Sequence, residues 1–369
     1  MDYTFTQEQK MIADSVGRLL KSDYDFQKRC HWLDNNQRFQ PGIWKKFAEL
    51  GLLAMPFEAS YGGLDASIQD MSVIVGEMGK SLVLEPFSFC YLGSLYLSRY
   101  ATSEQKQRYF PDIVSGEKRV VVCMPPACDG FFLNQQPETK AQKNKDQTWT
   151  LSGSQPMVYG ADSATDVIVF AKDDQDSIRA FMVSVEQIQC QKLSMIDDTG
   201  VANCRLKDVK VSQECMLGFD AQSLACLQVA IICLLSSEAV AIMQTVNEKT
   251  KQYLMNREQF SQPLSKFQLL QHRLVEMYVQ EEQARSLSMT LSMEVRDSKS
   301  ASDVLYLAYL TKLKMNDYCQ YVGEQSVQLH GGMGVSDEMD IAHYFRRLTC
   351  IRHQFGDQTY CLSKCLSFF

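Results

Sequence analysis

A group of polar residues in the second half of the chain has the types and spacing needed to bind a phosphate. Arg257 stands near the end of an expected helix, and Gln268 and Gln271 lie one turn apart on the next one. A guanidinium can donate two parallel hydrogen bonds to a phosphate. The alternative is that Arg257 only caps a helix and that the glutamines form a solvated face, because arginine is mostly a surface residue.

A cluster of glycines later in the chain has a second feature of a phosphate site. Gln328 is followed by Gly331, Gly332 and Gly334, after a long expected helix. Glycines allow backbone N–H groups to approach a phosphate closely, and a helix N-terminus adds partial positive charge. Taken alone, such a cluster is more often only a helix cap and a turn.

Three regions of different periodicity must position these residues. Residues 1–117 form an expected N-terminal α-helical domain, with Thr6 as the candidate N-cap of its first helix. Residues 118–217 contain short β-branched and alternating runs that predict a middle β domain, in which the polar segment 134–147 is expected to be a mobile surface loop. Residues 218–369 form an expected C-terminal α-helical bundle domain. This order predicts an α+β protein, unlike doubly wound folds in which strands and helices alternate.

The composition of the 369 residues argues against several classes of protein. The formal net charge is -7 with both signs interspersed, so no basic patch predicts a nucleic-acid partner. No N-terminal signal and no apolar run of about 18 residues is apparent, so no membrane span is expected. The 13 cysteines are scattered without a C-x-x-C pair. They indicate reduced thiols in a cytoplasmic protein and predict no metal site.

Together, these motifs resemble those of the acyl-CoA dehydrogenase family of flavoproteins. Arg257 to Gln271 is similar to the family motif R-x-x-F-G-x-x-(L/I)-x-x-F-Q-x-x-Q, and Gln328 to Gly334 is similar to its Q-x-x-G-G-x-G motif. Trp44 to Gly63 and Ser103 to Glu117 resemble two N-terminal segments, so the resemblance covers essentially the whole chain. It implies the acyl-CoA dehydrogenase fold, with an N-terminal helical domain, a middle β-barrel-like domain and a C-terminal four-helix bundle.

The resemblance implies FAD as the cofactor and an acyl-CoA thioester as the substrate. In the family, both motifs reach the FAD bound in a neighbouring subunit. Ser261 here replaces the glycine that usually follows the phenylalanine of the first motif. The resemblance also implies an electron-transfer flavoprotein as the electron acceptor. The residues expected to contact FAD are Arg257, Phe260, Gln268, Gln328, Gly331, Gly332 and Gly334.

Two segments of the middle region depart from the family pattern around the flavin ring. Where the family has a T/S-E-x-x-A-G-S-D loop, this chain has Met124 to Gly130, without the usual hydroxyl donors. The family's W-x-(I/T)-N-G-type segment is replaced by Pro156 to Ala161. The chain is therefore expected to keep the parts that reach a neighbour's FAD and to have altered the parts that hold its own.

The base that removes the substrate's α-proton is also missing from its usual place. This step requires a carboxylate in a dry cleft, and most of the family has a glutamate before the glycine of its C-terminal signature. Here Phe355 precedes Gly356, and the alternative position, among residues 229–233, holds no acid. Asp357 and Glu238 are candidates for a displaced base; the alternative for each is a helix cap or an ion pair.

Three functional hypotheses follow from this pattern. The first is a small or non-catalytic subunit of a heteromeric bacterial acyl-CoA dehydrogenase, similar to those acting on pimeloyl-CoA or steroid-derived CoA thioesters. Its α2β2 partner would supply the base. The second is a self-sufficient homotetrameric dehydrogenase that uses Asp357 or Glu238. The third is a scaffold subunit that binds no flavin, against which Arg257 and the glycine turn argue.

Overall fold

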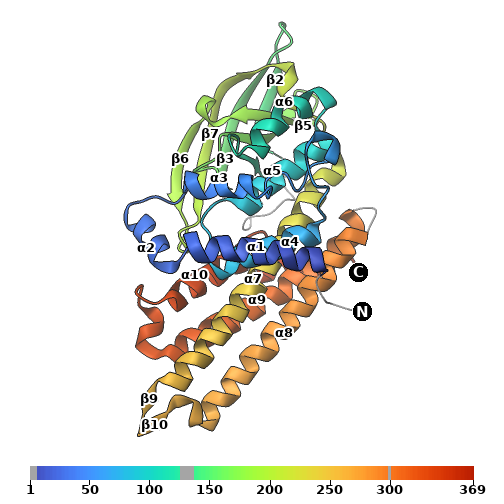
Figure 1. Ribbon diagram of the computed structural model, residues 1–369. Helices are drawn as coiled ribbons and strands as arrows, with labels where there is room; N and C mark the ends of the chain where they lie inside the picture. The colour runs from blue at the N-terminus through green and yellow to red at the C-terminus, as the bar shows by residue number, and fades with distance from the viewer. Residues whose placement is uncertain (1–5, 125–136, 298–300) are drawn as a thin grey trace. The chain divides into compact units, whose positions relative to one another are not determined.

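The computed structural model describes residues 6–124, 137–297 and 301–369. The chain divides into two compact units, which are described separately here (Figure 1). Unit 1 comprises Met1–His31, Ile68–Val83 and Ile232–Phe369, and unit 2 comprises Trp32–Ser67 and Leu84–Ile231.

The N-terminal part of the chain is helical, as its apolar spacing predicts. Thr6 caps the first helix, because its side chain accepts a hydrogen bond from Gln9 N while the Gln9 side chain accepts one from Thr6 N. Thr102 and Gln105 form the same capping box at α6. The helices are α1 (Gln7–Asp23), α2 (Phe26–Asp34), α3 (Pro41–Glu49), η1 (Ala59–Tyr61), α4 (Ile68–Lys80), α5 (Phe87–Tyr100) and α6 (Ser103–Val114).

Strands follow in unit 2 and form one sheet with the order β6-β7-β3-β2-β4-β5-β8, while β1 pairs in parallel with β4. The sheet has an apolar centre, because Val167 to Ala171 of β4 are fully buried. The strands are β1 (Val120–Cys123), β2 (Lys140–Lys143), β3 (Trp149–Tyr159), β4 (Asp166–Asp173), β5 (Ile178–Ser184), β6 (Gln189–Ser194), β7 (Gly200–Val211) and β8 (Met216–Leu217).

Strand β2 shows that the prediction of a mobile loop over residues 134–147 was wrong for its described part, since residues 134–136 lie outside the described residues. Lys140 pairs with Ser152 of β3, and Lys143 pairs with Trp149. Ala141 is buried and the other three β2 side chains are exposed. The strand was missed because it lacks the apolar alternation by which half-buried strands are recognised.

The C-terminal part of the chain is helical again. Helix α7 was underestimated from the sequence: its segment Gln222–Asn256 is long enough to cross a membrane and contains a window with a mean hydropathy of 2.1. However, 89% of that window is buried inside the protein, which is typical of a core helix. The elements are α7 (Ala221–Asn256), β9 (Glu258–Gln259), β10 (Gln262–Pro263), η4 (Leu264–Lys266), α8 (Gln268–Asp297), α9 (Ala301–His330), η5 (Gly331–Val335), α10 (Asp340–His353) and α11 (Gln358–Leu366).

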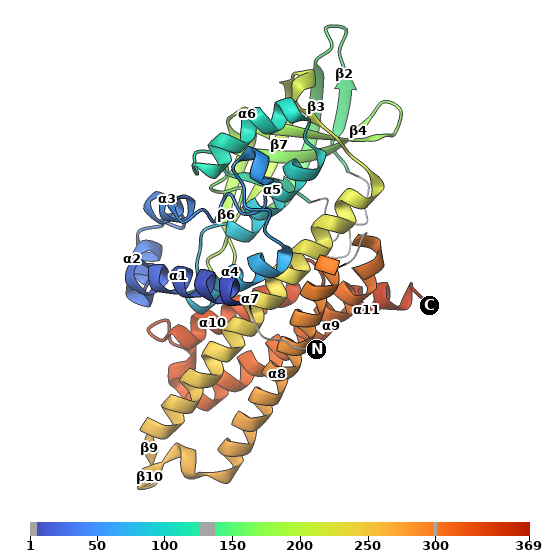
Figure 2. The same cartoon turned by 45° about the vertical axis from the view of Figure 1, so that its right-hand side comes forward.

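Within unit 1, α8 and α9 pack side by side, and α10 and α11 both pack on α9 (Figure 2). The β9–β10 hairpin lies at the ends of α7 and α8 in both views. The long helices therefore carry the connection that contains the first motif away from the other helices of this unit.

Candidate cofactor-binding site

The connection between α7 and α8 is a two-residue hairpin that fixes the position of Arg257. Phe260 and Ser261 form its turn with φ angles of 54° and 63°, the left-handed conformations that the tightest hairpin turns require. The Arg257 carbonyl accepts a hydrogen bond from Leu264 N at 2.8 Å, which closes the base of the hairpin. Gln268 begins α8 shortly after it.

The side chains of this hairpin are directed at solvent. Arg257 and Gln268 are exposed, and neither side chain has a hydrogen-bond or ion-pair partner among the described residues. Phe260 is 82% exposed and packs edge-on against Phe267 with ring centroids 6.0 Å apart. An exposed ring beside an unpaired guanidinium and amide is a surface that gains from contact with another molecule.

The glycine cluster after α9 contains one glycine that the fold requires and two that leave space. A Cβ on Gly334 would come within 2.6 Å of Val327 O, so only glycine fits there. Gly331 has a φ of 62°, which glycine adopts readily. Nothing in the described part of the chain lies within 4 Å of a Cβ built on Gly332. The exposed backbone at Gly332 therefore has room for close approach by a ligand.

Helices α7 and α9 bring the hairpin and the glycine cluster together. The Tyr253 ring stacks on His330 with centroids 4.3 Å apart, and Tyr253 Oη donates to His330 O at 3.3 Å. Arg257 follows Tyr253 by about one helical turn, and Gly331 follows His330 directly. Burial lowers the pKa of His330, which favours the neutral ring donating from Nδ1 to Ser326 O. The two motifs recognised in the sequence thus lie next to one another.

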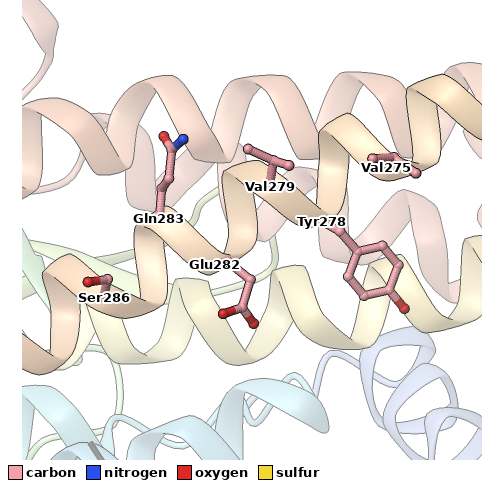
Figure 3. A pocket seen from close by; sticks show the side chains of 6 residues that line it. All are labelled: Val275, Tyr278, Val279, Glu282, Gln283 and Ser286. Carbon is pink, nitrogen blue, oxygen red and sulfur yellow. The ribbon is translucent and has the colours of Figure 1, made fainter.

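An exposed apolar strip begins close to the hairpin and continues along α8. Leu269, Val275 and Val279 are 65%, 60% and 46% exposed. A shallow pocket lies beside this strip, and Figure 3 shows that Val279 and Gln283 point to one side of α8 and Tyr278 and Glu282 to the other. The pocket is lined by Val275, Tyr278, Val279, Glu282, Gln283 and Ser286.

The Phe355-Gly356 turn after α10 is fastened by two buried side chains of α9. Phe355 is 5% exposed and has a φ of 52°, a left-handed conformation that costs an aromatic residue about 1–2 kcal/mol. Lys312 Nζ donates to the Gly356 carbonyl at 2.8 Å, and Asn316 Nδ2 donates to the same oxygen at 2.9 Å. These two donors hold the turn in place despite its unfavourable backbone.

Lys312 was not singled out from the sequence, although a signal for it exists. Its ammonium also donates to Ile351 O and Arg352 O in the last turn of α10, at 2.9 and 3.1 Å, where a cation complements the helix dipole. Burial lowers the pKa of Lys312 to about 8. Ala308 and Met315 are fully buried at helical spacing on either side of it, so the apolar period of α9 marks Lys312 as a buried cation.

The two carboxylates considered as displaced bases have other partners in the structure. Glu238 accepts hydrogen bonds from Arg347 Nε at 2.6 Å and Nη2 at 2.7 Å. Gly79 of α4 packs directly on it, since a Cβ there would come within 2.9 Å of Glu238 Cγ. Asp357 is the N-cap of α11 and accepts a hydrogen bond from Tyr360 N at 2.8 Å.

The candidate base Glu238 and the hairpin belong to different parts of α7. The helix is continuous between Glu238 and Arg257 up to its last residue, Asn256, which corresponds to about 28 Å at 1.5 Å per residue. The structure therefore does not bring this carboxylate to the motif that was expected to contact FAD.

Only part of the altered flavin-ring region falls within the described residues. Of the segment Met124 to Gly130, residues 125–130 lie outside them. Pro156 to Ala161 occupy the end of β3 and the turn after it, where the register with β7 is irregular. Met157 has a φ of 53°, and its N–H donates to Asn203 Oδ1 at 2.9 Å. The backbone of this segment is thus bonded within unit 2.

Comparison with known proteins was made against family models and relatives. The model described as acyl-CoA dehydrogenase, N-terminal domain, matches residues 6–117, and the model described as acyl-CoA dehydrogenase, C-terminal domain, matches residues 229–360. A probable acyl-CoA dehydrogenase, YngJ of Bacillus subtilis, is 27% identical over 372 residues that cover 94% of this chain and 93% of the relative.

Solved structures show the same fold. An acyl-CoA dehydrogenase from Geobacillus kaustophilus matches with a TM-score of 0.90 at 22% identity, covering 99% of this chain and 98% of the other. A chain of the ChsE4-ChsE5 complex from Mycobacterium tuberculosis matches with a TM-score of 0.89 at 20% identity, covering 100% and 98%. The predicted fold, with helical, β and helical domains in this order, is confirmed.

The fold and the matched models define the class of protein as an FAD-dependent oxidoreductase acting on CH–CH bonds. The chain belongs to the acyl-CoA dehydrogenase family. The family and the cofactor implied by the sequence motifs are therefore confirmed, while the division of work between subunits is a separate question.

Proposed function

We propose that this chain is the non-catalytic subunit of a heteromeric acyl-CoA dehydrogenase that desaturates an acyl-CoA thioester between its α and β carbons. The observation that carries the proposal is Phe355, a buried phenyl ring where most of the family has its catalytic glutamate. A phenyl ring cannot accept a proton, so the base must come from elsewhere. A second subunit of the same family, in an α2β2 assembly, supplies that carboxylate and most of the acyl pocket.

The carboxylates of this chain support the assignment of the base to a partner. A general base must reach the proton that it abstracts and must be available to accept it. Both oxygens of Glu238 are engaged by the Arg347 guanidinium, and Asp357 is engaged by the first turn of α11. These contacts favour the heteromeric hypothesis over a self-sufficient homotetramer that uses either residue.

The hairpin and the glycine cluster fit the FAD of the partner subunit. The exposed Arg257 guanidinium suits a pyrophosphate, to which it can donate two hydrogen bonds, and Gln268 and Gln328 offer amide donors beside it. Phe260 presents a ring face, and the open backbone at Gly332 fits a group that approaches closely. When bound, FAD supplies the acceptor for the hydride that leaves the substrate's β-carbon.

The exposed strip on α8 supports packing against another subunit, because burial of Leu269, Val275 and Val279 would remove apolar surface from water. One structure of similar fold is a chain of the ChsE4-ChsE5 complex, and another is titled a steroid acyl-CoA dehydrogenase. By analogy, the acyl group is proposed to be a steroid-derived or pimeloyl-type chain. The proposal is completed by an electron-transfer flavoprotein as electron acceptor and by a cytoplasmic location.

Replacing Arg257 with Ala in the complex is expected to weaken FAD binding about 30-fold, because a charge-assisted bond is worth about 2 kcal/mol. The exposed side chain carries no partner within the described chain, so the melting temperature of the flavin-free complex should not change. Fluorescence titration of the flavin-free complex with FAD measures the affinity. The matched control is Lys266→Ala, at an exposed cation of the same connection. Equal affinities for the Arg257 variant and the control would contradict the assignment.

A further inference from the structure

Strands β6 and β7 hold two thiols face to face in unit 2. Cys190 of β6 is paired with Cys204 of β7 in the antiparallel register, and their Sγ atoms are 3.1 Å apart. Paired residues on antiparallel strands have Cα atoms about 4.5–5.5 Å apart, within the span of about 4.4–6.8 Å that suits a disulfide. The sulfur atoms need to approach by only about 1 Å to reach bonding distance.

The two thiols differ in the way that an exchange reaction requires. Strand β6 is an edge of the sheet, and Cys190 is partly exposed, whereas Cys204 is 2% exposed. The hydrogen bond with Cys204, and then the nearby Lys192 ammonium, lower the pKa of Cys190. The same hydrogen bond and burial raise the pKa of Cys204. Cys190 is thus the thiol that reacts first with an external reagent.

We propose that Cys190 and Cys204 form a reversible disulfide on reaction with a small-molecule disulfide such as oxidised glutathione. The Cys190 thiolate attacks one sulfur of the reagent and displaces one glutathione thiolate, which leaves a mixed disulfide. Cys204 then loses its proton and attacks Cys190 Sγ, which displaces the second glutathione. The protein loses two protons and two electrons, and one glutathione disulfide is reduced to two thiols.

A third thiol in this region makes the choice of partner testable. Cys123 of β1 is 1% exposed, and its charge interacts with those of both Cys190 and Cys204. Direct pairing in the ladder favours the bridge between Cys190 and Cys204. Such a bridge would fasten the edge strand β6 to β7, which continues the sheet through β3.

Trypsin offers a direct measurement, because the two cysteines fall into adjacent peptides, residues 180–192 and 193–205. The full-length chain, with any subunit that co-purifies, is equilibrated with oxidised glutathione, alkylated and digested. The expected product is a cross-link between these two peptides that disappears after reduction. Cys30, a partly exposed thiol in the peptide of residues 30–38, should remain outside any cross-link.

Variants distinguish the proposed pair from general thiol oxidation. Cys204→Ser should retain glutathione on Cys190, because no resolving thiol remains, and Cys123→Ser should form the same cross-link as the unchanged chain. The proposal is overturned if both peptides stay alkylated in the unchanged chain, or if Cys190 keeps its glutathione there. A cross-link from Cys190 to Cys123 would also overturn it.

Discussion

Replacing Arg347 with Met is expected to lower the free energy of unfolding by about 3–5 kcal/mol. The Arg347 guanidinium donates two hydrogen bonds to Glu238, and the two side chains are only 11% and 12% exposed. Met preserves much of the volume but leaves a buried carboxylate without its counter-charge. That loss outweighs the gain in apolar packing. Urea unfolding followed by circular dichroism measures the change.

Two further variants show whether burial causes the loss. Arg285→Met breaks an ion pair with Glu282 in which the side chains are 48% and 55% exposed, so the expected change is within about 1 kcal/mol. Combining Glu238→Leu with Arg347→Met replaces both buried partners by apolar groups and should recover most of the stability. Comparable losses in Arg285→Met and Arg347→Met would contradict the argument from burial.

Replacing Lys312 with Met is expected to lower the free energy of unfolding by about 3 kcal/mol. The ammonium is fully buried and donates to the carbonyls of Ile351, Arg352 and Gly356. Without it, the first two carbonyls lose a donor in a buried place, and Asn316 alone remains on Gly356. The matched control is Lys314→Met on the same helix, where a half-exposed ammonium lies 3.8 Å from Asp317 and the expected loss is within about 0.5 kcal/mol.

The contribution of Lys312 is also expected to depend on pH. Burial lowers its pKa from 10.5 to about 8, so between these values the unfolded chain binds more protons than the folded one. Stability from this site therefore rises with pH across that window, and the cost of burying the charge is fully present below pH 8. The stability difference between the unchanged chain and Lys312→Met should grow above pH 8 by up to about 1.4 kcal/mol per pH unit. A difference that shrinks as the pH rises would refute the buried-ammonium assignment.

The order of the elements and the two binding motifs could be predicted from the sequence because they depend on local patterns. Apolar spacing marked most helices, and Thr6 was recognised as an N-cap that the structure confirms. Strand β2 escaped because only Ala141 faces inward. The hairpin turn also gave no warning, because Phe260 and Ser261 both take left-handed angles that are usually signalled by glycine or asparagine. Local chemistry thus predicted where the chain turns, but not the conformation of that turn.

Contacts between distant parts of the chain could not be predicted from a single sequence. Glu238 looked like a free acid, and its partner Arg347 is 109 positions away, so no local pattern joins them. Phe355 had been recognised as the substitute for the usual base, but the donors that hold its turn come from α9. Lys312 is the exception, because the buried period of α9 already placed it inside the protein.

The most direct test of the heteromeric assignment is the flavin content and activity of the chain alone and after co-expression with a second acyl-CoA dehydrogenase subunit. The chain alone is predicted to hold little FAD and to show no dehydrogenase activity, because Phe355 cannot take the α-proton. The complex is predicted to hold FAD in stoichiometric amount and to reduce an electron acceptor when acyl-CoA is added. Stoichiometric FAD together with dehydrogenase activity in the chain alone would contradict the account.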